Sequence, residues 1–328
     1  MLPALATKFA VATVLISTVA GGVAEDPTTL RESSAVVSRV PLFSQVGDTQ
    51  CDADGNFYFN TSLSPSDSGL LKVAHDGSKF HLYKLPARDA DSKYYHFREF
   101  NVTPSGELRV LAYGSDSVPY LFHFDSDLGD TSKLKLELPE HFQVDSFAAF
   151  ESGAILVTGY FDGHADKEEQ GKTYTAIFEA SGALKAVVGG RFGNVDLAAV
   201  RKKLSEGGAA LGEDGYFYLL RPDQVVVVSE SGSIVRRMTF KKPSLDRLAT
   251  RIIVSAGLIV VELQKDEGLG KELKVQYLVL NSSSGNRVGL FEPEPALGNN
   301  FLCFSGSTGF AFLTVRDDKV TLLTVPIR

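Results

Sequence analysis

The sequence contains no tryptophan, two methionines and only two cysteines among its 328 residues. Two cysteines are too few for a disulfide-rich module, and no Cys and His residues cluster as they would in a zinc finger. Basic residues are also scarce, with 33 Lys and Arg against 40 Asp and Glu. Nucleic-acid binding needs a basic surface, so we expect no nucleic-acid partner.

Familiar catalytic motifs are missing as well. The sequence has no GxSxG nucleophile elbow, no HExxH zinc motif and no phosphate-binding loop. The histidines at positions 75, 81, 96, 123 and 141 are scattered through the chain, which is typical of structural histidines. What remains is a globular composition, with 44% hydrophobic and 22% charged residues.

The N-terminus differs from the rest of the chain. Lys8 is the only charged side chain before Glu25, and an apolar run of eleven residues extends from Phe9 to Val19. Gly22 and Ala24 are small residues placed as in a signal-peptidase site. We therefore predict a signal peptide at 1–24, a flexible segment at 25–34, and a secreted or periplasmic mature chain. No later segment is apolar enough to cross a membrane as a helix.

A turn motif returns along the chain. It first occurs as "CDADGNFYF" and continues as "NVTPSGELRVLAY", "AAFESGAILVTGY", "ALGEDGYFYLL", "IIVSAGLIVVEL" and "LCFSGSTGFAFLTV". A second series lies between these, for example "KVAHDGSKFHLYKL" and "VVVVSESGSIVRRMTF". Each member has an apolar alternation, a polar turn ending in glycine, and another alternation, which is typical of a β-hairpin.

Two hairpins in roughly 50 residues give the four strands of a propeller blade. We predict an all-β, six-bladed β-propeller at 35–328, with four antiparallel strands in each blade. The sixth repeat has only three strands, whereas "AVVSRVPLF" at 35–43 precedes the first repeat. We expect this segment to be the outermost strand of the last blade, closing the ring without an exposed edge.

The repeated strand, Asp-Gly turn, strand, strand, Gly turn, strand pattern resembles the six-bladed propellers of the NHL and TolB-like superfamily. The resemblance covers nearly all of the chain after the predicted signal peptide. In blades 3 to 5 the glycines remain, although the aspartates that mark the best family repeats are lost.

Connections between strands two and three, and between blades, lie on the face opposite the glycine turns. On that face "YFDGHADKEEQGKTY" in blade 3 and "LQKDEGLGKEL" in blade 5 are long, charged loops. Such loops are usually only solvated, but Asp162, His164 and Asp166 also form a candidate ligand set for a divalent cation. The link "GNVDLAAVRKKLSEGG" has helical spacing and predicts a short helix.

A ligand would bind where the innermost strands begin, at the mouth of the central channel. Counting back from the first-series glycines places polar residues there in five of six blades. They are Asp48, Arg98, Glu99, Asp145, Arg251 and Asn299, and the rim is extended by Tyr94, Tyr95 and His96. The bland interpretation is that strand ends are solvated in any protein.

Cys51 and Cys303 belong to the innermost strands of blades 1 and 6, which are neighbours if the ring closes. A disulfide there would fix the seam, and two separate thiols are the equal alternative.

Two functions compete. The first is an exported, non-enzymatic, monomeric propeller that presents one loop face to a protein or carbohydrate partner and needs no cofactor. The alternative is a metal-dependent hydrolase or lyase of the lactonase or esterase type, with its site at the channel mouth. The resemblance to such propellers implies a cation such as Ca²⁺, with Glu99, Asp145 and Asn299 as candidate ligands.

Overall fold

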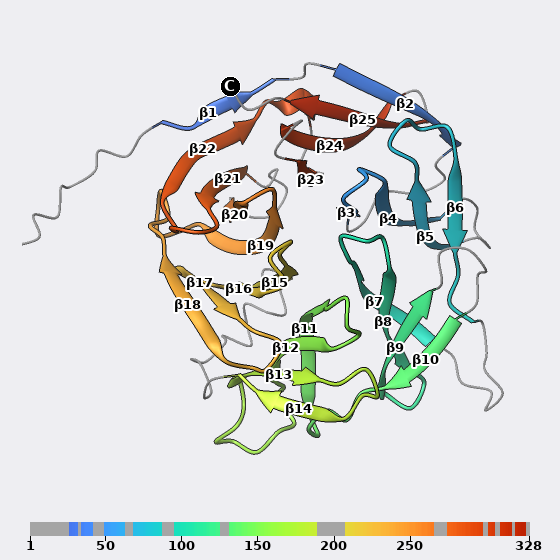
Figure 1. Ribbon diagram of the computed structural model, residues 1–328, viewed down its shortest axis with the longest axis vertical. Helices are drawn as coiled ribbons and strands as arrows, with labels where there is room; N and C mark the ends of the chain where they lie inside the picture. Colours follow the sequence, from blue (N-terminus) through green and yellow to red (C-terminus); the bar gives the residue numbers. More distant parts are fainter. Residues whose placement is uncertain are drawn as a thin grey trace, which may run out of the picture.

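The protein is a ring of six β-sheets, seen along the ring axis in the computed structural model (Figure 1). This confirms the predicted six-bladed propeller with four antiparallel strands in each blade. The structure describes residues 26–31, 34–41, 49–62, 68–86, 95–124, 131–188, 207–265, 274–297, 301–305, 309–316 and 319–325. The predicted helix at 193–208 lies almost entirely outside these ranges.

Blades 1 to 6 follow one another along the chain, each running from an innermost to an outermost strand. Blade 1 is β3 (Thr49–Cys51), β4 (Phe57–Ser62), β5 (Ser68–Val73) and β6 (Phe80–Tyr83). Blade 2 is β7 (Tyr95–Val102), β8 (Leu108–Gly114), β9 (Pro119–Phe124) and β10 (Thr131–Lys135). Blade 3 is β11 (Phe142–Ala149), β12 (Ile155–Phe161), β13 (Thr173–Phe178) and β14 (Leu184–Val187).

The second half repeats this order. Blade 4 is β15 (Gly208–Leu211), β16 (Phe217–Arg221), β17 (Gln224–Val228) and β18 (Ile234–Thr239). Blade 5 is β19 (Leu248–Ser255), β20 (Leu258–Lys265), β21 (Lys274–Asn281) and β22 (Arg287–Pro293), followed by the short 3-10 helix η1 (Pro295–Leu297). Blade 6 is β23 (Phe301–Ser305), β24 (Gly309–Arg316) and β25 (Lys319–Val325).

The repeated Asp-Gly turn works through one buried carboxylate. In blade 1, Asp52 accepts hydrogen bonds from the backbone and side-chain nitrogens of Asn56, each at 2.9 Å, and from the Tyr58 hydroxyl at 3.0 Å. Burial and the neighbouring Asp52 raise the pKa of Tyr58, so its hydroxyl stays a donor. The aromatic residues after the turn are therefore core residues, and the acid ties the turn to them.

Glycine is needed at some of these turns by both conformation and space. Gly182 has a φ of 86°, in the left-handed region that other residues avoid. A Cβ there would also lie 2.6 Å from the carbonyl oxygen of Lys135 in the neighbouring blade. The same positive φ recurs at the first-series glycines 55, 106, 153, 215 and 257.

The core lies between neighbouring blades. Between blades 5 and 6, the fully buried rings of Tyr277, Phe301, Phe310 and Phe312 pack with centroids 4.6 to 6.4 Å apart. Each aromatic side chain removes a large apolar area from water, so every inter-blade layer stabilises both of its sheets. A ring of such layers is stable only when its last blade meets its first.

The ring closes as predicted. Strand β2 (Ser34–Pro41) pairs antiparallel with β25, in a register that runs from Ser34 opposite Thr324 to Pro41 opposite Lys319. The N-terminal strand thus becomes the outermost strand of blade 6, whose order is β2-β25-β24-β23 (Figure 1).

A strand that the sequence did not predict precedes it. The segment 25–34 was expected to be flexible, but β1 (Thr28–Leu30) pairs parallel with β22 and makes blade 5 five-stranded. Leu30 is buried against the core between blades 5 and 6, and its carbonyl accepts a hydrogen bond from Glu294 N at 3.1 Å. Pro293, opposite Leu30, has no backbone N–H to donate, and Glu294 supplies the donor in its place.

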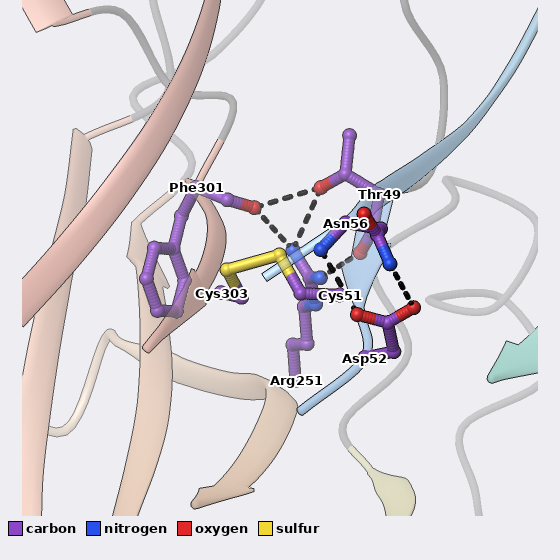
Figure 2. Close-up of a disulfide and its surroundings, with 7 residues drawn as sticks. All are labelled: Thr49, Cys51, Asp52, Asn56, Arg251, Phe301 and Cys303. Atoms are coloured by element: carbon purple, nitrogen blue, oxygen red, sulfur yellow. Dashed lines mark hydrogen bonds between the residues drawn. A yellow bond between two sulfur atoms is a disulfide. The ribbon is translucent and has the colours of Figure 1, made fainter. Parts of the chain in front are cut away.

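Blades 1 and 6 are also joined near the channel. A disulfide links Cys51 in β3 to Cys303 in β23, with Cα atoms 5.7 Å apart (Figure 2). Beside it, the Thr49 hydroxyl donates a hydrogen bond to the carbonyl oxygen of Phe301 at 2.8 Å. This seam therefore has a covalent and a hydrogen-bonded part.

The hairpin turns of both series lie on one side of the ring, here called the turn face. The opposite link face carries the blade-to-blade connections and the loops between second and third strands, including residues 162–172 between β12 and β13. Among the described residues, no helix has the length and hydropathy needed to span a bilayer.

The disulfide closes a loop with a sequence separation of 252 residues. Replacing both cysteines, Cys51→Ala with Cys303→Ala, should lower the free energy of unfolding by about 2–5 kcal/mol, because the unfolded chain gains freedom. Urea unfolding measures this. Reductant should shift the wild-type midpoint and leave that of the double variant unchanged; equal midpoints for the two proteins without reductant would contradict the expectation.

The parallel strand β1 can be tested through its one buried side chain. Leu30 is 3% exposed, so Leu30→Ala should lower the free energy of unfolding by about 2–5 kcal/mol. The loss is smaller if β1 detaches from the sheet first, because it cannot exceed the free energy with which β1 docks. Faster proteolysis of the N-terminal segment, together with the urea midpoint, reports the loss. Thr29→Ala is the matched control, because Thr29 is exposed in the same strand. Identical behaviour of the two variants would show that β1 does not dock.

Candidate functional site at the channel mouth

Four innermost strands are interrupted at the same level near the link face. The pairing register shifts between Phe97 and Glu99, Val144 and Ser146, Ala249 and Arg251, and Phe301 and Cys303. A β-bulge bends its strand and re-aims one side chain. In blades 2 and 3 the extra residues are Arg98 and Asp145, two of the residues predicted for the mouth.

The predicted site residues have different positions. Asp48, Tyr94 and Asn299 lie outside the described residues. His96 and Arg98 are exposed on β7, whereas Glu99, Asp145 and Arg251 are partly buried. Tyr95 turns away from the mouth and packs edge-on against Tyr120 and Phe122, with centroids 5.4 and 4.8 Å apart.

Five side chains from blades 2, 3 and 4 form what we call the mouth cluster. Its members are Arg98 on β7, Tyr113 on β8, Asp145 on β11, Tyr160 on β12 and Arg221 on β16. The charges of Arg98 and Asp145 both act on the Tyr160 phenol, and Asp145 also acts on Arg221. The Asp145 carboxylate thus lies near two guanidinium groups and a phenol, and Asp162 also acts on Tyr160.

Burial sets the protonation of the phenols. Desolvation and then the Asp145 charge raise the pKa of Tyr160, while the Arg98 guanidinium opposes this. Burial likewise raises the pKa of Tyr113, whose oxygen accepts a hydrogen bond from Val144 N at 3.2 Å. Both phenols are therefore neutral at physiological pH, and that of Tyr160 is a hydrogen-bond donor.

Arg221 is held from behind by two threonines. Its Nη2 donates to Thr175 Oγ1 at 2.9 Å, and that hydroxyl contacts Thr158 Oγ1, also at 2.9 Å. Burial lowers the pKa of Arg221, and the charge of the Asp145 carboxylate opposes the change. Arginine keeps its charge in such a place, which fixes a positive group at the base of the mouth cluster.

A second carboxylate is tied in through Ser146. The Ser146 hydroxyl donates to Glu99 Oε1 at 3.2 Å and accepts a hydrogen bond from Ala209 N, also at 3.2 Å. This chain joins the innermost strands of blades 2, 3 and 4. At the start of its innermost strand, blade 4 places Gly207 and Gly208, and a Cβ at Gly207 would lie 3.5 Å from Asp145 Oδ2.

Arg251 has a structural contact on the other side of the channel. From blade 5 its guanidinium donates to the carbonyl oxygens of Phe301, at 2.6 Å, and of Thr49 (Figure 2). It also lies over the Phe301 ring, 5.7 Å from the centroid. The guanidinium therefore braces blades 5, 6 and 1 at the seam.

The candidate ligands in the blade 3 loop are already engaged in part. Asp162 Oδ1 accepts from His164 N at 2.8 Å, and Oδ2 accepts from Gln143 Nε2 at 3.0 Å. Over the described ranges, no group of three or more His, Cys, Asp or Glu side chains is placed to hold a metal ion, here or at the mouth. The described residues alone thus do not fit the divalent cation that a lactonase-type propeller would imply.

The sequence did not single out Tyr113, Tyr160 or Arg221. Each stands at or next to the end of a second strand, and second strands return to the link face where the innermost strands begin. The available signal was the antiparallel order of the hairpins, which brings the last residues of one strand beside the first of its neighbour.

Comparisons with known proteins agree on the fold. The sequence matches no protein-family model and no curated protein. A calcium-binding protein, regucalcin, from Agrobacterium tumefaciens is 15% identical, covers 92% of this chain and 97% of its own, and has a TM-score of 0.51. A gluconolactonase from Xanthomonas campestris is 13% identical, covers 90% and 99%, and has a TM-score of 0.48.

At such identities the likeness extends to the fold alone. The likeness to the regucalcin structure, with a TM-score of 0.51, supports the fold over 92% of the chain. The narrower assignment to the NHL and TolB-like superfamily stays a prediction, because these structures carry other names.

Truncation of Arg251 should lower the free energy of unfolding much more than truncation of Arg98. Arg251→Met removes charged hydrogen bonds to two other blades and should lower the free energy of unfolding by about 1.5–3 kcal/mol. Arg98→Met, at an exposed side chain, should change it by no more than about 0.5 kcal/mol. Urea unfolding of both variants gives the comparison. A larger loss of stability for Arg98→Met than for Arg251→Met would contradict the structural role that we assign to Arg251.

Proposed function

We propose that the protein is a hydrolase of the lactonase or esterase type whose site is the mouth cluster. The carrying observation is that Asp145 lies among Arg98, Tyr160 and Arg221, on three successive blades. This combination offers a proton acceptor, a neutral donor and positive charge at one end of the ring. The regucalcin fold likeness supports the scaffold and adds nothing on the substrate.

The chemistry follows from these groups. Asp145 accepts a proton from a water molecule as its oxygen attacks the ester carbonyl carbon. The guanidinium of Arg98 stabilises the negative charge that develops on the carbonyl oxygen. The carbon–oxygen bond to the alkoxy group then breaks, and the leaving oxygen takes up the proton. Water is consumed, and a carboxylic acid and an alcohol are formed.

The charge balance indicates the substrate class. The guanidinium groups of Arg98 and Arg221 and the carboxylate of Asp145 belong to the mouth cluster, and the carboxylates of Glu99 and Asp162 lie beside it, so charges of both signs are available to a neutral, polar substrate. Hydroxyl groups on the substrate would find acceptors in the carboxylates of Asp145 and Glu99. Small hydroxylated esters or lactones meet both conditions. No step is assigned to a metal ion, because the described residues do not gather a ligand set.

A second candidate is a non-enzymatic scaffold that presents the link face to a protein or carbohydrate partner. The loop at 162–172 favours it. Gln170 Nε2 donates to the carbonyl oxygens of Gly163 and Ala165, at 2.9 and 2.8 Å, so the loop is shaped while its charged side chains Lys167 and Glu168 stay exposed. Such a preformed surface lowers the entropy lost on binding.

The hydrolase proposal is tested with a panel of hydroxylated lactones and small esters, assayed with and without added Ca²⁺, Zn²⁺ or Mn²⁺. Asp145→Asn should lower kcat about 10²- to 10⁴-fold, as expected for loss of a general base. Arg98→Gln should lower kcat and kcat/KM together, because it weakens stabilisation of the charge that develops on the carbonyl oxygen in the transition state. Arg237→Gln is the matched control, because Arg237 is exposed on the outermost strand β18.

Failure has two distinct forms. Turnover that survives Asp145→Asn would move the activity away from the mouth cluster. No turnover of any compound under any of these conditions, with retained folding, would favour the scaffold. A divalent ion bound in stoichiometric amount and lost with activity on chelation would instead add a metal to the proposed site.

A further inference from the structure

Two histidines meet on the link face, beside the two inner strands of blade 3, β11 and β12. His141 belongs to the link between blades 2 and 3, and His164 to the loop between β12 and β13. Their ring centroids are 6.2 Å apart with an interplanar angle of 38°. Both residues are exposed, so neither ring is there to fill the core.

The backbone holds the two segments together through Asp162. Asp162 N donates to the carbonyl oxygen of His141 at 3.0 Å, and His164 N donates to Asp162 Oδ1 at 2.8 Å. The other carboxylate oxygen accepts from Gln143 Nε2 at 3.0 Å. Asp162 therefore fixes the spacing of the two imidazoles, and its own oxygens are occupied in doing so.

His141 has an unusual backbone conformation. Its φ is 59°, in the left-handed region, one of three non-glycine residues with positive φ among those described. This conformation is unfavourable for a residue with a side chain, and residues strained in this way cluster at functional sites. The conformation brings the ring beside its neighbour: His141 Nε2 lies 3.6 Å from Glu140 Oε1.

These distances suit a shared metal ion. Two ligand atoms about 2.0–2.1 Å from one ion at the tetrahedral angle are about 3.4 Å from each other, close to the Nε2–Oε1 separation. For two imidazoles on one ion, the same bond lengths give ring centroids about 5–6 Å apart. A small rotation of the exposed His164 side chain closes the remaining gap, next to Gly163, where a Cβ would have no atom within 4 Å.

We propose that His141, His164 and Glu140 form a binding site for a divalent transition metal of the zinc class. Imidazole nitrogen suits zinc, copper and nickel, and a carboxylate completes three protein ligands. The ligands converge only when the ion binds, since no such group is preformed among the described residues. The bound ion would fasten the blade 3 loop to the blade link. This site is separate from the mouth cluster.

The test is titration of the purified full chain with Zn²⁺ by calorimetry, with Co²⁺ absorption spectra reporting imidazole ligation. We expect one tightly bound zinc ion per chain. His164→Gln and His141→Asn should each weaken binding at least tenfold; asparagine is chosen because it tolerates the left-handed conformation. The matched control is His123→Gln, because His123 Nε2 lies 3.8 Å from Glu107 Oε2 without a second histidine nearby.

The outcomes separate cleanly. Loss in the two site variants with full binding in the control supports the site. No binding to the wild type at millimolar zinc, or equal affinity in all four proteins, overturns it, as does loss in the control alone. Circular dichroism without metal checks folding, and His164→Gln carries the test if His141→Asn does not fold. Because binding is read directly, the result is independent of any hydrolase activity.

Discussion

The closure of the ring is the constraint on which the rest of the structure depends. Each blade buries its faces against two neighbours, so a gap between blades 6 and 1 would expose apolar layers on both sides. Three contacts of different kinds prevent this: the pairing of β2 with β25, the Cys51–Cys303 disulfide, and the Arg251 guanidinium. The first lies at the outer edge of blade 6, and the other two lie beside the channel.

The candidate site inherits its geometry from this closed frame. Innermost strands that begin at the same level bring Arg98 and Asp145 to one end of the channel, and their bulges re-aim both residues. Second strands end beside them and add Tyr160 and Arg221. Three blades contribute to the mouth cluster, so the distances between its side chains are set by the apolar packing between blades and not by the polar groups themselves.

Local signals explain what the sequence could predict. An Asp-Gly turn such as Asp52 to Gly55 encodes a hairpin within a few residues, and its repetition gave the blade number and the closing strand. Cys51 and Cys303 could be placed as neighbours once the ring was assumed. Arg98 and Asp145 could be placed at the mouth by counting back from a turn, since a strand has a fixed rise per residue.

Non-local contacts explain what it could not. Arg251 looks like any charged residue at a strand start, and only the distance to the carbonyls of Thr49 and Phe301 shows that it braces the seam. Strand β1 is three residues long and carries no alternation, so its pairing depends on a partner more than 250 positions away. The approach of His141 to His164 depends on a backbone conformation that composition does not reveal.

The places of β1 and β2 have a consequence for synthesis. Each is made long before its partner, because more than 250 residues separate β1 from β22 and β2 from β25. Until β25 has been synthesised, β2 has no partner, and the sheets of blades 1 to 5 stack as an open arc. Ring formation must then follow, and until it happens both terminal sheets present an uncovered apolar face to other molecules.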